Sequence, residues 1–111
     1  MSVIESLTVP RLLADKYCIR ILSATFNKPR SAQELSIMLG IPIASCYRKI
    51  KELENTELIK PVSKSLTGFG KWVENYQSQI NCVNISFQKN RLKVRLDLAW
   101  KPVQEFEEIL A

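Results

Sequence analysis

The stretch SAQELSIMLGIPIASCYRKIKELENTEL, residues 31–58, predicts two helices with a sharp break between them. Ser31 and Glu34 have the spacing of a capping box, in which each side chain accepts a free backbone N–H at a helix start. Gly40 supplies the positive φ angle at which helices often end, and Pro42 suits a helix start, where its missing N–H is not needed. We therefore expect a short helix, a tight turn and a longer helix, which together form a helix-turn-helix.

The longer helix, expected over residues 42–56, has two chemically different faces. One face is apolar and is expected to pack in the core; it consists of Ile43, Cys46, Ile50 and Leu53. The other face is small and basic; it consists of Ala44, Ser45, Arg48 and Lys51. A helix of this kind after a tight turn is typical of the recognition helix of a DNA-binding protein.

The composition is that of one soluble globular domain, residues 1–111, with 46% hydrophobic and 24% charged residues. No apolar run approaches the roughly 18–20 residues of a membrane span. The first ten residues lack the basic start and apolar core of a signal peptide. We therefore expect a cytoplasmic protein that makes no membrane contact.

The positive charge is concentrated around the helix pair. The chain has 16 basic and 11 acidic residues, a formal net charge of +5. Between residues 28 and 71, eight basic residues stand against four acidic ones, so most of the excess lies there. Such an excess favours a polyanionic partner.

The residue types argue against catalysis and metal binding. The chain has no histidine, which excludes Ser-His and Cys-His nucleophilic sites. Cys18, Cys46 and Cys82 are far apart and odd in number, so they form neither a disulfide framework nor a zinc site. We expect small buried thiols, with a redox switch as the alternative, and we expect no enzyme, no metal and no cofactor.

Another helix is expected before the pair. Asp15 is its expected N-cap, and an apolar face continues to about Phe26. Residues 1–13 fit either a short strand or a frayed helix, and Pro10 interrupts both.

Two strands are expected after the pair. Residues 58–64 form the first, with Pro61 typical of an outer or irregular strand, and residues 72–78 form the second. The loop LTGFGK, residues 66–71, joins them. A hairpin directly after a helix-turn-helix is a wing.

This order of elements resembles the winged helix-turn-helix transcription regulators of the ArsR/MarR type, particularly small archaeal members. The segments that carry the resemblance are ADKYCIRIL (14–22), SAQEL (31–35), LGIP (39–42), YRKIKELE (47–54) and LI (58–59). The resemblance implies an α+β fold in which residues 14–78 form a three-helix core with a β-hairpin wing. It also implies double-stranded DNA as the partner and a homodimer as the assembly.

Two features of the sequence depart from the family pattern. Glu57 stands where such proteins usually carry glycine before the Leu-Ile strand, and a non-glycine residue in a left-handed conformation costs about 1 kcal/mol. The Cys-x-Cys signature of metal-sensing members is absent, so we expect no metal sensing.

Residues 79–111 are expected to form a second hairpin and a short helix. Apolar and polar residues alternate over 83–87 and 92–98, with a turn at 88–91. Pro102 is expected to open a short amphipathic helix, which docks on its own domain or, as we favour, on a second subunit. The residues assigned to dimerisation are Trp100, Val103, Phe106, Ile109 and Leu110.

We expect the helix over 42–56 to lie in the major groove. There Arg48 reads guanine, and Ala44 and Ser45 contact bases or a thymine methyl group. The wing and the flanking basic residues hold the DNA backbone. The remaining assigned contacts are Lys28, Arg30, Ser31, Tyr47, Lys49, Lys51, Lys64, Thr67 and Lys71. The alternative for each basic residue is a solvated side chain that binds nothing.

Three functions fit this pattern. We favour a sequence-specific transcription regulator. The alternatives are a winged-helix module that binds another protein and an architectural DNA-binding protein without sequence preference. A protein-binding module is expected to expose apolar residues on the helix over 42–56. The sequence does not define an effector, an operator, or activation versus repression.

Overall fold

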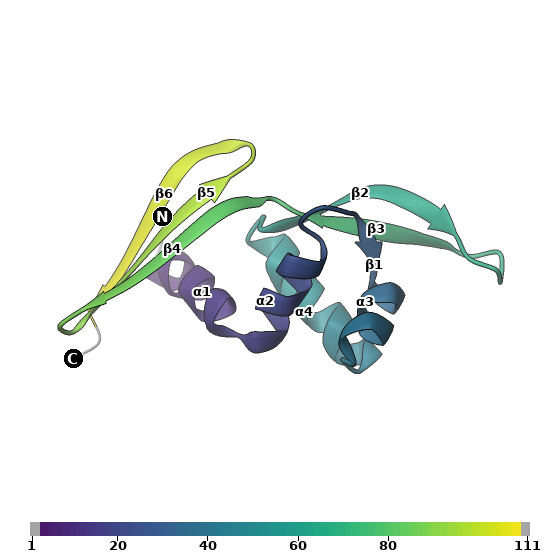
Figure 1. The fold of residues 1–111 in the computed structure, drawn as a ribbon, viewed down its shortest axis with the longest axis horizontal. Coiled ribbons are helices and arrows are strands. Elements are labelled where there is room, and N and C mark those ends of the chain that lie inside the picture. Colours follow the sequence, from purple (N-terminus) through teal and green to yellow (C-terminus); the bar gives the residue numbers. More distant parts are fainter. Residues whose placement is uncertain (1–2, 110–111) are drawn as a thin grey trace.

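A computed structural model describes residues 3–109 and shows an α+β fold with four helices and two three-stranded antiparallel sheets within that range (Figure 1). The molecule is elongated, with principal extents of 52 × 27 × 23 Å. None of the helices in the described range is long and apolar enough to cross a membrane. The elements are α1 (Val3–Ala14), α2 (Lys16–Ala24), β1 (Arg30–Ser31), α3 (Ala32–Leu39), α4 (Ile43–Asn55), β2 (Ile59–Leu66), β3 (Trp72–Ser78), β4 (Ile80–Gln88), β5 (Arg91–Leu98) and β6 (Lys101–Ile109).

The N-terminal segment, which the sequence left open between strand and helix, forms α1 from residue 3 onward. Pro10 lies inside this helix and is buried, so tertiary packing outweighs the hydrogen bond that proline removes. Asp15 caps α2 as predicted, and its carboxylate accepts the backbone N–H groups of Tyr17 at 2.9 Å and Cys18 at 3.0 Å. Residues 14–78 thus contain three helices, as expected, and α1 adds a fourth helix before them.

The predicted helix pair is confirmed as α3 and α4. Both arms of the capping box form at the start of α3, and Gly40 ends this helix at φ 66°. α4 ends in the same manner, because the N–H of Leu58 donates to the carbonyl of Leu53 and the N–H of Glu57 donates to that of Glu54. Glu57 occupies the left-handed position at φ 64°, where the sequence suggested strain.

The first predicted hairpin is confirmed as β2 and β3. It projects to the right in Figure 1, beyond α3 and α4. The register shifts between Pro61 and Ser63, as expected for a strand that contains proline. The sequence did not indicate β1, whose two residues pair with Tyr76 and Asn75 of β3 and anchor the start of α3 to the hairpin.

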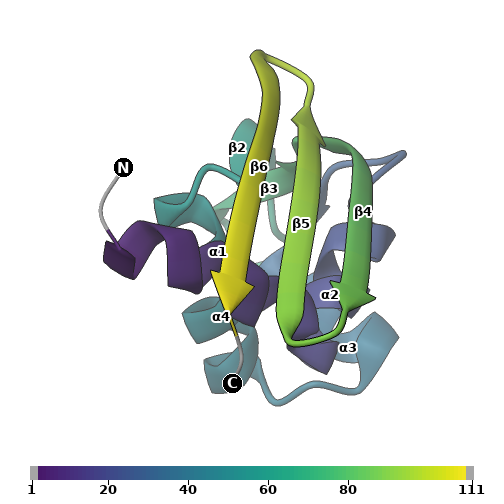
Figure 2. The ribbon, with the colours of Figure 1, turned by 90° about the vertical axis from the view of Figure 1, so that its left-hand side faces the viewer.

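The second sheet has the order β4–β5–β6 and lies across one end of the helices (Figure 2). The second predicted hairpin is confirmed as β4 and β5. The inner face of β5 consists of Val94, Leu96 and Leu98, which are buried in one core with residues of α1, α2 and α4.

The prediction of a short C-terminal helix from Pro102 is wrong, because residues 101–109 form the strand β6. The apolar residues here also fit helical spacing, but the charges between them match the outer face of β5. Glu105 lies opposite Arg95, and Glu107 lies opposite Lys93 and forms an ion pair with Arg91 at 3.1 Å. Opposite charges on paired strands stabilise the pairing, whereas an isolated helix of this length is marginal.

Candidate nucleic-acid interface

The two faces of α4 are separated much as predicted. Cys46, Ile50 and Leu53 are buried. Ala44, Arg48 and Lys51 are exposed and Ser45 is partly exposed. Ile43 differs from the prediction, since it is 43% exposed rather than part of the core.

Several basic side chains are exposed on and near the helix pair. Within the described range, no ion pair or side-chain hydrogen bond ties them to the protein. They are Lys28 before α3, Arg48 and Lys51 on α4, and Lys64 and Lys71 on the β2–β3 hairpin. An exposed cation without a partner in the protein can bind an external anion, because no existing ion pair has to be broken first.

The tip of the hairpin is held in one shape by Thr67. Its hydroxyl accepts the backbone N–H of Lys71 at 3.1 Å, and its backbone N–H donates to the carbonyl of Lys71 at 2.7 Å. Gly70 adopts φ 76° and donates its N–H to Thr67 at 3.0 Å. Thr67 therefore shapes the loop, and the cations beside it stand on a defined turn.

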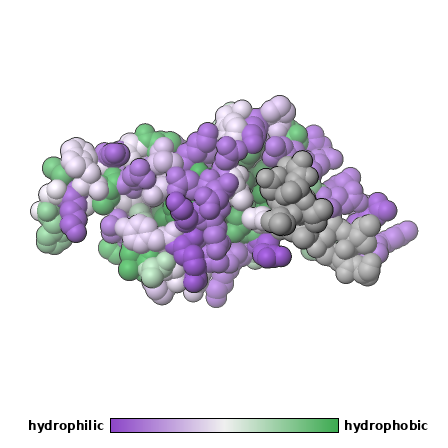
Figure 3. Space-filling model, turned by 180° about the vertical axis from the view of Figure 1, so that it is seen from behind, coloured by the Kyte–Doolittle hydropathy of each residue, from purple (hydrophilic) through white to green (hydrophobic). Residues whose placement is uncertain are grey.

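Two exposed aromatic residues at this tip were not assigned from the sequence. Phe69 is 94% exposed and Trp72 is 67% exposed. Seen from behind, the hairpin end at the left mixes hydrophobic and hydrophilic atoms, whereas hydrophilic atoms dominate the middle of the molecule (Figure 3). The two flanking glycines indicated a loop, but no pattern indicated that the phenylalanine between them lacks a packing partner.

A groove of about 520 Å³ lies between α4 and β3, lined by cationic and anionic side chains. Arg48 and Lys51 line it from α4, and Glu74 and Tyr76 line it from β3. The Tyr76 hydroxyl donates to Glu74 at 3.2 Å, and burial, with this hydrogen bond, raises the pKa of Tyr76 to about 12. Glu54 and Glu74 therefore place negative charge beside Arg48 and Lys51, which disfavours a phosphate inside the groove.

Two residues assigned to the DNA backbone are engaged inside the protein. Arg30 is half-buried and donates from Nε to the carbonyl of Ala24 at 2.9 Å, with an ion pair to Glu34 at 3.3 Å. Ser31 is buried and caps α3 through its hydroxyl. The Arg30 guanidinium and the Ser31 hydroxyl therefore help to fix the position of α3. The contact expected at the Ser31 helix start, through its free backbone N–H groups, stays a prediction.

Lys49 is also engaged. Its ammonium lies 2.7 Å from Asp15 and 3.8 Å from Glu52, with the side chain only 17% exposed. The hydrogen bond between Lys49 and Asp15 raises the pKa of the lysine and lowers the pKa of the aspartate. This pair joins α4 to the start of α2.

Tyr47 is half-exposed, and its hydroxyl accepts a hydrogen bond from Gln33 Nε2 at 3.0 Å. The contact links the outer faces of α3 and α4. The hydroxyl still has its own proton to donate, so it remains available to a phosphate oxygen.

The residues assigned to dimerisation are not gathered on one surface. Phe106 is buried in the core of its own chain, and the ammonium groups of Lys60 and Lys101 lie 4.1 Å and 4.4 Å from the centroid of the Trp100 ring. Val103 is 45% exposed on β6. Leu110 and the side chain of Ile109 lie outside the described residues.

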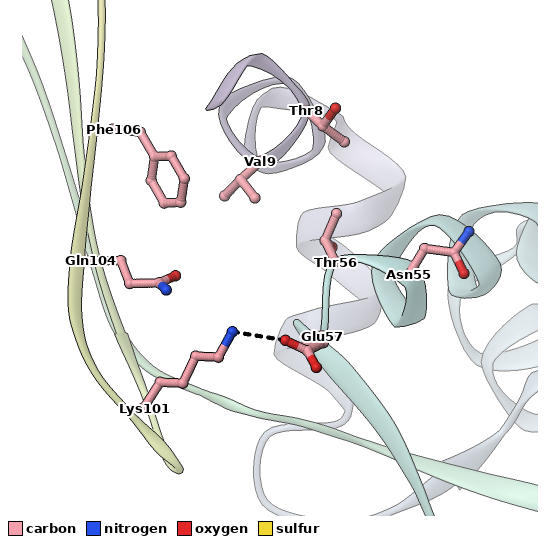
Figure 4. Close-up of a pocket in the computed structure, with 8 residues that line it drawn as sticks. All are labelled: Thr8, Val9, Asn55, Thr56, Glu57, Lys101, Gln104 and Phe106. Carbon is pink, nitrogen blue, oxygen red and sulfur yellow. Dashed lines mark hydrogen bonds and ion pairs between the residues drawn. The ribbon is translucent and has the colours of Figure 1, made fainter. Parts of the chain in front are cut away.

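A cavity of about 210 Å³ lies where α1, the end of α4 and β6 meet (Figure 4). Lys101 reaches across it to Glu57, and their ion pair measures 2.8 Å. Val9 and Phe106 supply its apolar wall. The ion pair ties the C-terminal sheet to the strained end of α4.

Comparison with protein-family models finds no match for this chain, and neither does comparison with curated proteins. In the part of the chain that the structure describes, no three acidic or cysteine side chains gather into a metal-binding group. The function is therefore inferred from the geometry of α4 and the β2–β3 hairpin.

Proposed function

We propose that this protein is a sequence-specific transcription regulator with a winged helix-turn-helix of the ArsR/MarR type. In this proposal α4 enters the major groove of double-stranded DNA, and the β2–β3 hairpin is the wing. One observation carries the proposal: Arg48 and Lys51 stand unpaired on the exposed face of the second helix of the pair, and the adjacent hairpin carries further exposed cations.

Arg48 is the residue proposed to read sequence. Its guanidinium suits a bidentate contact to guanine, worth roughly 1–3 kcal/mol of discrimination. Ala44 and Ser45 lie one turn earlier on α4, where small side chains allow close approach to base edges.

The backbone contacts are proposed for Lys28, Lys51, Lys64 and Lys71, with Tyr47 as a further donor. Lysine ammonium groups on a defined scaffold bind phosphates as point charges and carry no sequence information. Arg30, Ser31, Thr67 and Lys49 are proposed to shape this surface instead, because their polar groups are used within the protein.

A second candidate, a protein-binding module, is favoured by a different observation. Ile37 is 85% exposed, Met38 is 51% exposed and Ile43 is 43% exposed, and all three lie around the turn between α3 and α4. Exposed apolar residues of this kind are common at protein interfaces.

Selection of bound duplexes from random DNA separates the functions. A regulator enriches one motif, and a dimeric regulator enriches a two-fold motif with half-sites about 10 bp apart. Strong binding without enrichment indicates an architectural protein, and no binding indicates the protein module. Lys93→Ala, which removes an exposed cation on β5 in the other sheet, is the matched control for Arg48→Ala.

A further inference from the structure

β4 is an outer strand of its sheet and lacks the charged residues and proline that protect such strands; its one irregularity is a register shift at its start, between Ile80 and Cys82. Its sequence, INCVNISFQ, contains no charged residue and no proline, and within the described residues no strand pairs with its outer side. The opposite outer strand, β6, carries Lys101, Pro102 and three glutamates. Because an outer strand offers unpaired N–H and C=O groups, monomeric proteins protect it with charges or proline. By this criterion β6 is protected and β4 is not.

The same strand exposes large apolar side chains. Ile85 is 48% exposed and Phe87 is 67% exposed, and they lie opposite Val94 and Leu92 of β5. This half of β4 runs to the hairpin tip that stands clear of the helices at the left of Figure 1. A face that is buried along β5 thus continues uncovered along β4.

The uncovered face extends onto α2. A groove of about 400 Å³ lies between the start of β4 and α2. Ile19 and Phe26 line it and are 43% and 50% exposed. The apolar surface therefore borders the unpaired backbone of β4 along most of its length.

We propose that β4 pairs antiparallel with β4 of a second copy of this chain, so that two three-stranded sheets join into one sheet of six strands. The two copies are then related by a two-fold axis and bury the same residues. Because β4 carries no charge, no register of self-pairing places like charges opposite each other. Registers centred on Asn84, Ile85 or Ser86 all set an apolar side chain against another apolar side chain.

A second copy fits this strand better than a charged peptide, which finds no complementary charge on β4. The dimer also deepens the proposed function, on which its biological use rests, since two copies present two α4 helices to a two-fold DNA site. It replaces the C-terminal residues as the dimer contact, because Phe106 is buried in its own chain and the Trp100 ring already contacts Lys60 and Lys101.

The test is the mass of the full chain in solution without DNA, measured by light scattering after size exclusion. The wild type is expected to have twice the mass of the chain. Ile85→Lys is expected to be a monomer at roughly tenfold the concentration at which the wild type is dimeric. The reason is that each lysine then faces its copy in the register centred on Ile85, or faces Val83 or Phe87 in the other two registers. Val103→Lys is the matched control: it has nearly the same exposure, 45%, but lies on the opposite outer strand, and it should remain dimeric.

Circular dichroism shows whether each variant is folded, and Phe87→Lys replaces Ile85→Lys if that chain unfolds. The proposal is overturned if the wild type is monomeric, or if Val103→Lys separates the copies while Ile85→Lys does not. A dimer that binds no DNA overturns the proposed function alone. If both hold, Ile85→Lys should lose more than about tenfold in affinity for a two-fold site and keep its affinity for a half-site.

Discussion

Asp15 acts on two elements at once. Its carboxylate caps α2 through the N–H groups of Tyr17 and Cys18, and it pairs with Lys49 of α4 at 2.7 Å. The contact is partly buried, so removing one partner leaves the other charge poorly solvated. Lys49 therefore contributes to the orientation of the proposed recognition helix without touching DNA.

Substitution of Asp15 separates these roles. Asp15→Asn keeps a capping oxygen and loses the charge, so we expect a loss of about 1 kcal/mol in the free energy of unfolding. Asp15→Ala loses both and should cost about 2–3 kcal/mol. Urea denaturation measures both values. Equal losses in the two variants would show that the capping hydrogen bonds contribute nothing, and no loss in Asp15→Asn would show that the ion pair contributes nothing.

The pH dependence of Asp15→Asn follows from the same contact. The hydrogen bond to Lys49 lowers the pKa of Asp15 from 3.8, so this contribution is present above that value and is lost as the pH falls through the folded pKa. The hydrogen bond to Asp15 raises the pKa of Lys49 from 10.5, so its contribution is full below that value and is lost as the pH rises through the folded pKa. The stability difference between wild type and variant should be flat from about pH 5 to 10 and should shrink outside that window. A difference that changes near neutral pH would contradict this explanation.

The three thiols should differ in reactivity. Cys18 and Cys46 are buried, and burial raises the pKa of Cys46 and raises that of Cys18 to about 12. Cys82 is exposed. Because the thiolate is the reactive form, a thiol reagent at pH 8 should modify one cysteine quickly in the native chain and all three after unfolding. Cys82→Ser should abolish the fast phase, and its persistence would show that the core opens readily.

At the scale of the elements, Glu57 marks the junction between α4 and the wing. Glu57→Gly should remove strain of about 1 kcal/mol and lose an exposed ion pair to Lys101 worth about 0–1 kcal/mol. The free energy of unfolding should therefore rise by up to about 1 kcal/mol. Lys101→Met removes the ion pair together with the contact of Lys101 with the Trp100 ring, so its loss is an upper bound for the ion pair. Thermal unfolding of both variants tests the prediction. A clear loss of stability in Glu57→Gly would mean that the interactions of the glutamate side chain stabilise the fold by more than its backbone strain costs.

The sequence predicted the elements whose signals are local. Ser31, Gly40 and Asp15 mark helix ends through contacts with neighbouring residues, so their positions follow from spacing alone. β6 could not be predicted in this way, since Val103 and Phe106 fit a helix, and only the register against β5 favours a strand. The candidate site shows the same limit. Arg48 was predicted correctly to lie on the exposed face of α4. Lys49, however, pairs with Asp15, which is distant in sequence, and Arg30 donates to the backbone carbonyl of Ala24. Residue spacing reveals neither contact.

At the scale of the whole molecule, the two ends of the long axis expose chemically different surfaces. The α3–α4 end, with the β2–β3 hairpin, exposes unpaired cations, and the β4–β5 end exposes an uncharged strand with apolar side chains. Figure 1 places these two ends at opposite extremes of the long axis. Pairing through one end therefore leaves the other free for DNA, so both proposals are compatible in one assembly.

The charge around the groove gives a prediction at this scale. Glu74 lies opposite Lys64 on the hairpin and lines the groove with Arg48. Glu74→Gln removes a negative charge near the proposed DNA path, so affinity for duplex DNA should rise a few-fold, with the largest gain at low salt. Fluorescence anisotropy measures this. Glu107→Gln, on the far sheet, is the control, and an equal gain in both variants would indicate only a general charge effect.

DNA binding by the exposed face of α4 is tested most directly by the affinities of the wild type and Arg48→Ala for a duplex that carries the selected motif. We expect anisotropy titrations to show a roughly 10- to 100-fold loss for Arg48→Ala on that motif and a smaller loss on unrelated DNA. Lys64→Ala should weaken both and reduce the salt slope by about one unit. Unchanged affinity of Arg48→Ala for the selected motif, or no binding of duplex DNA by the wild type, would contradict the claim.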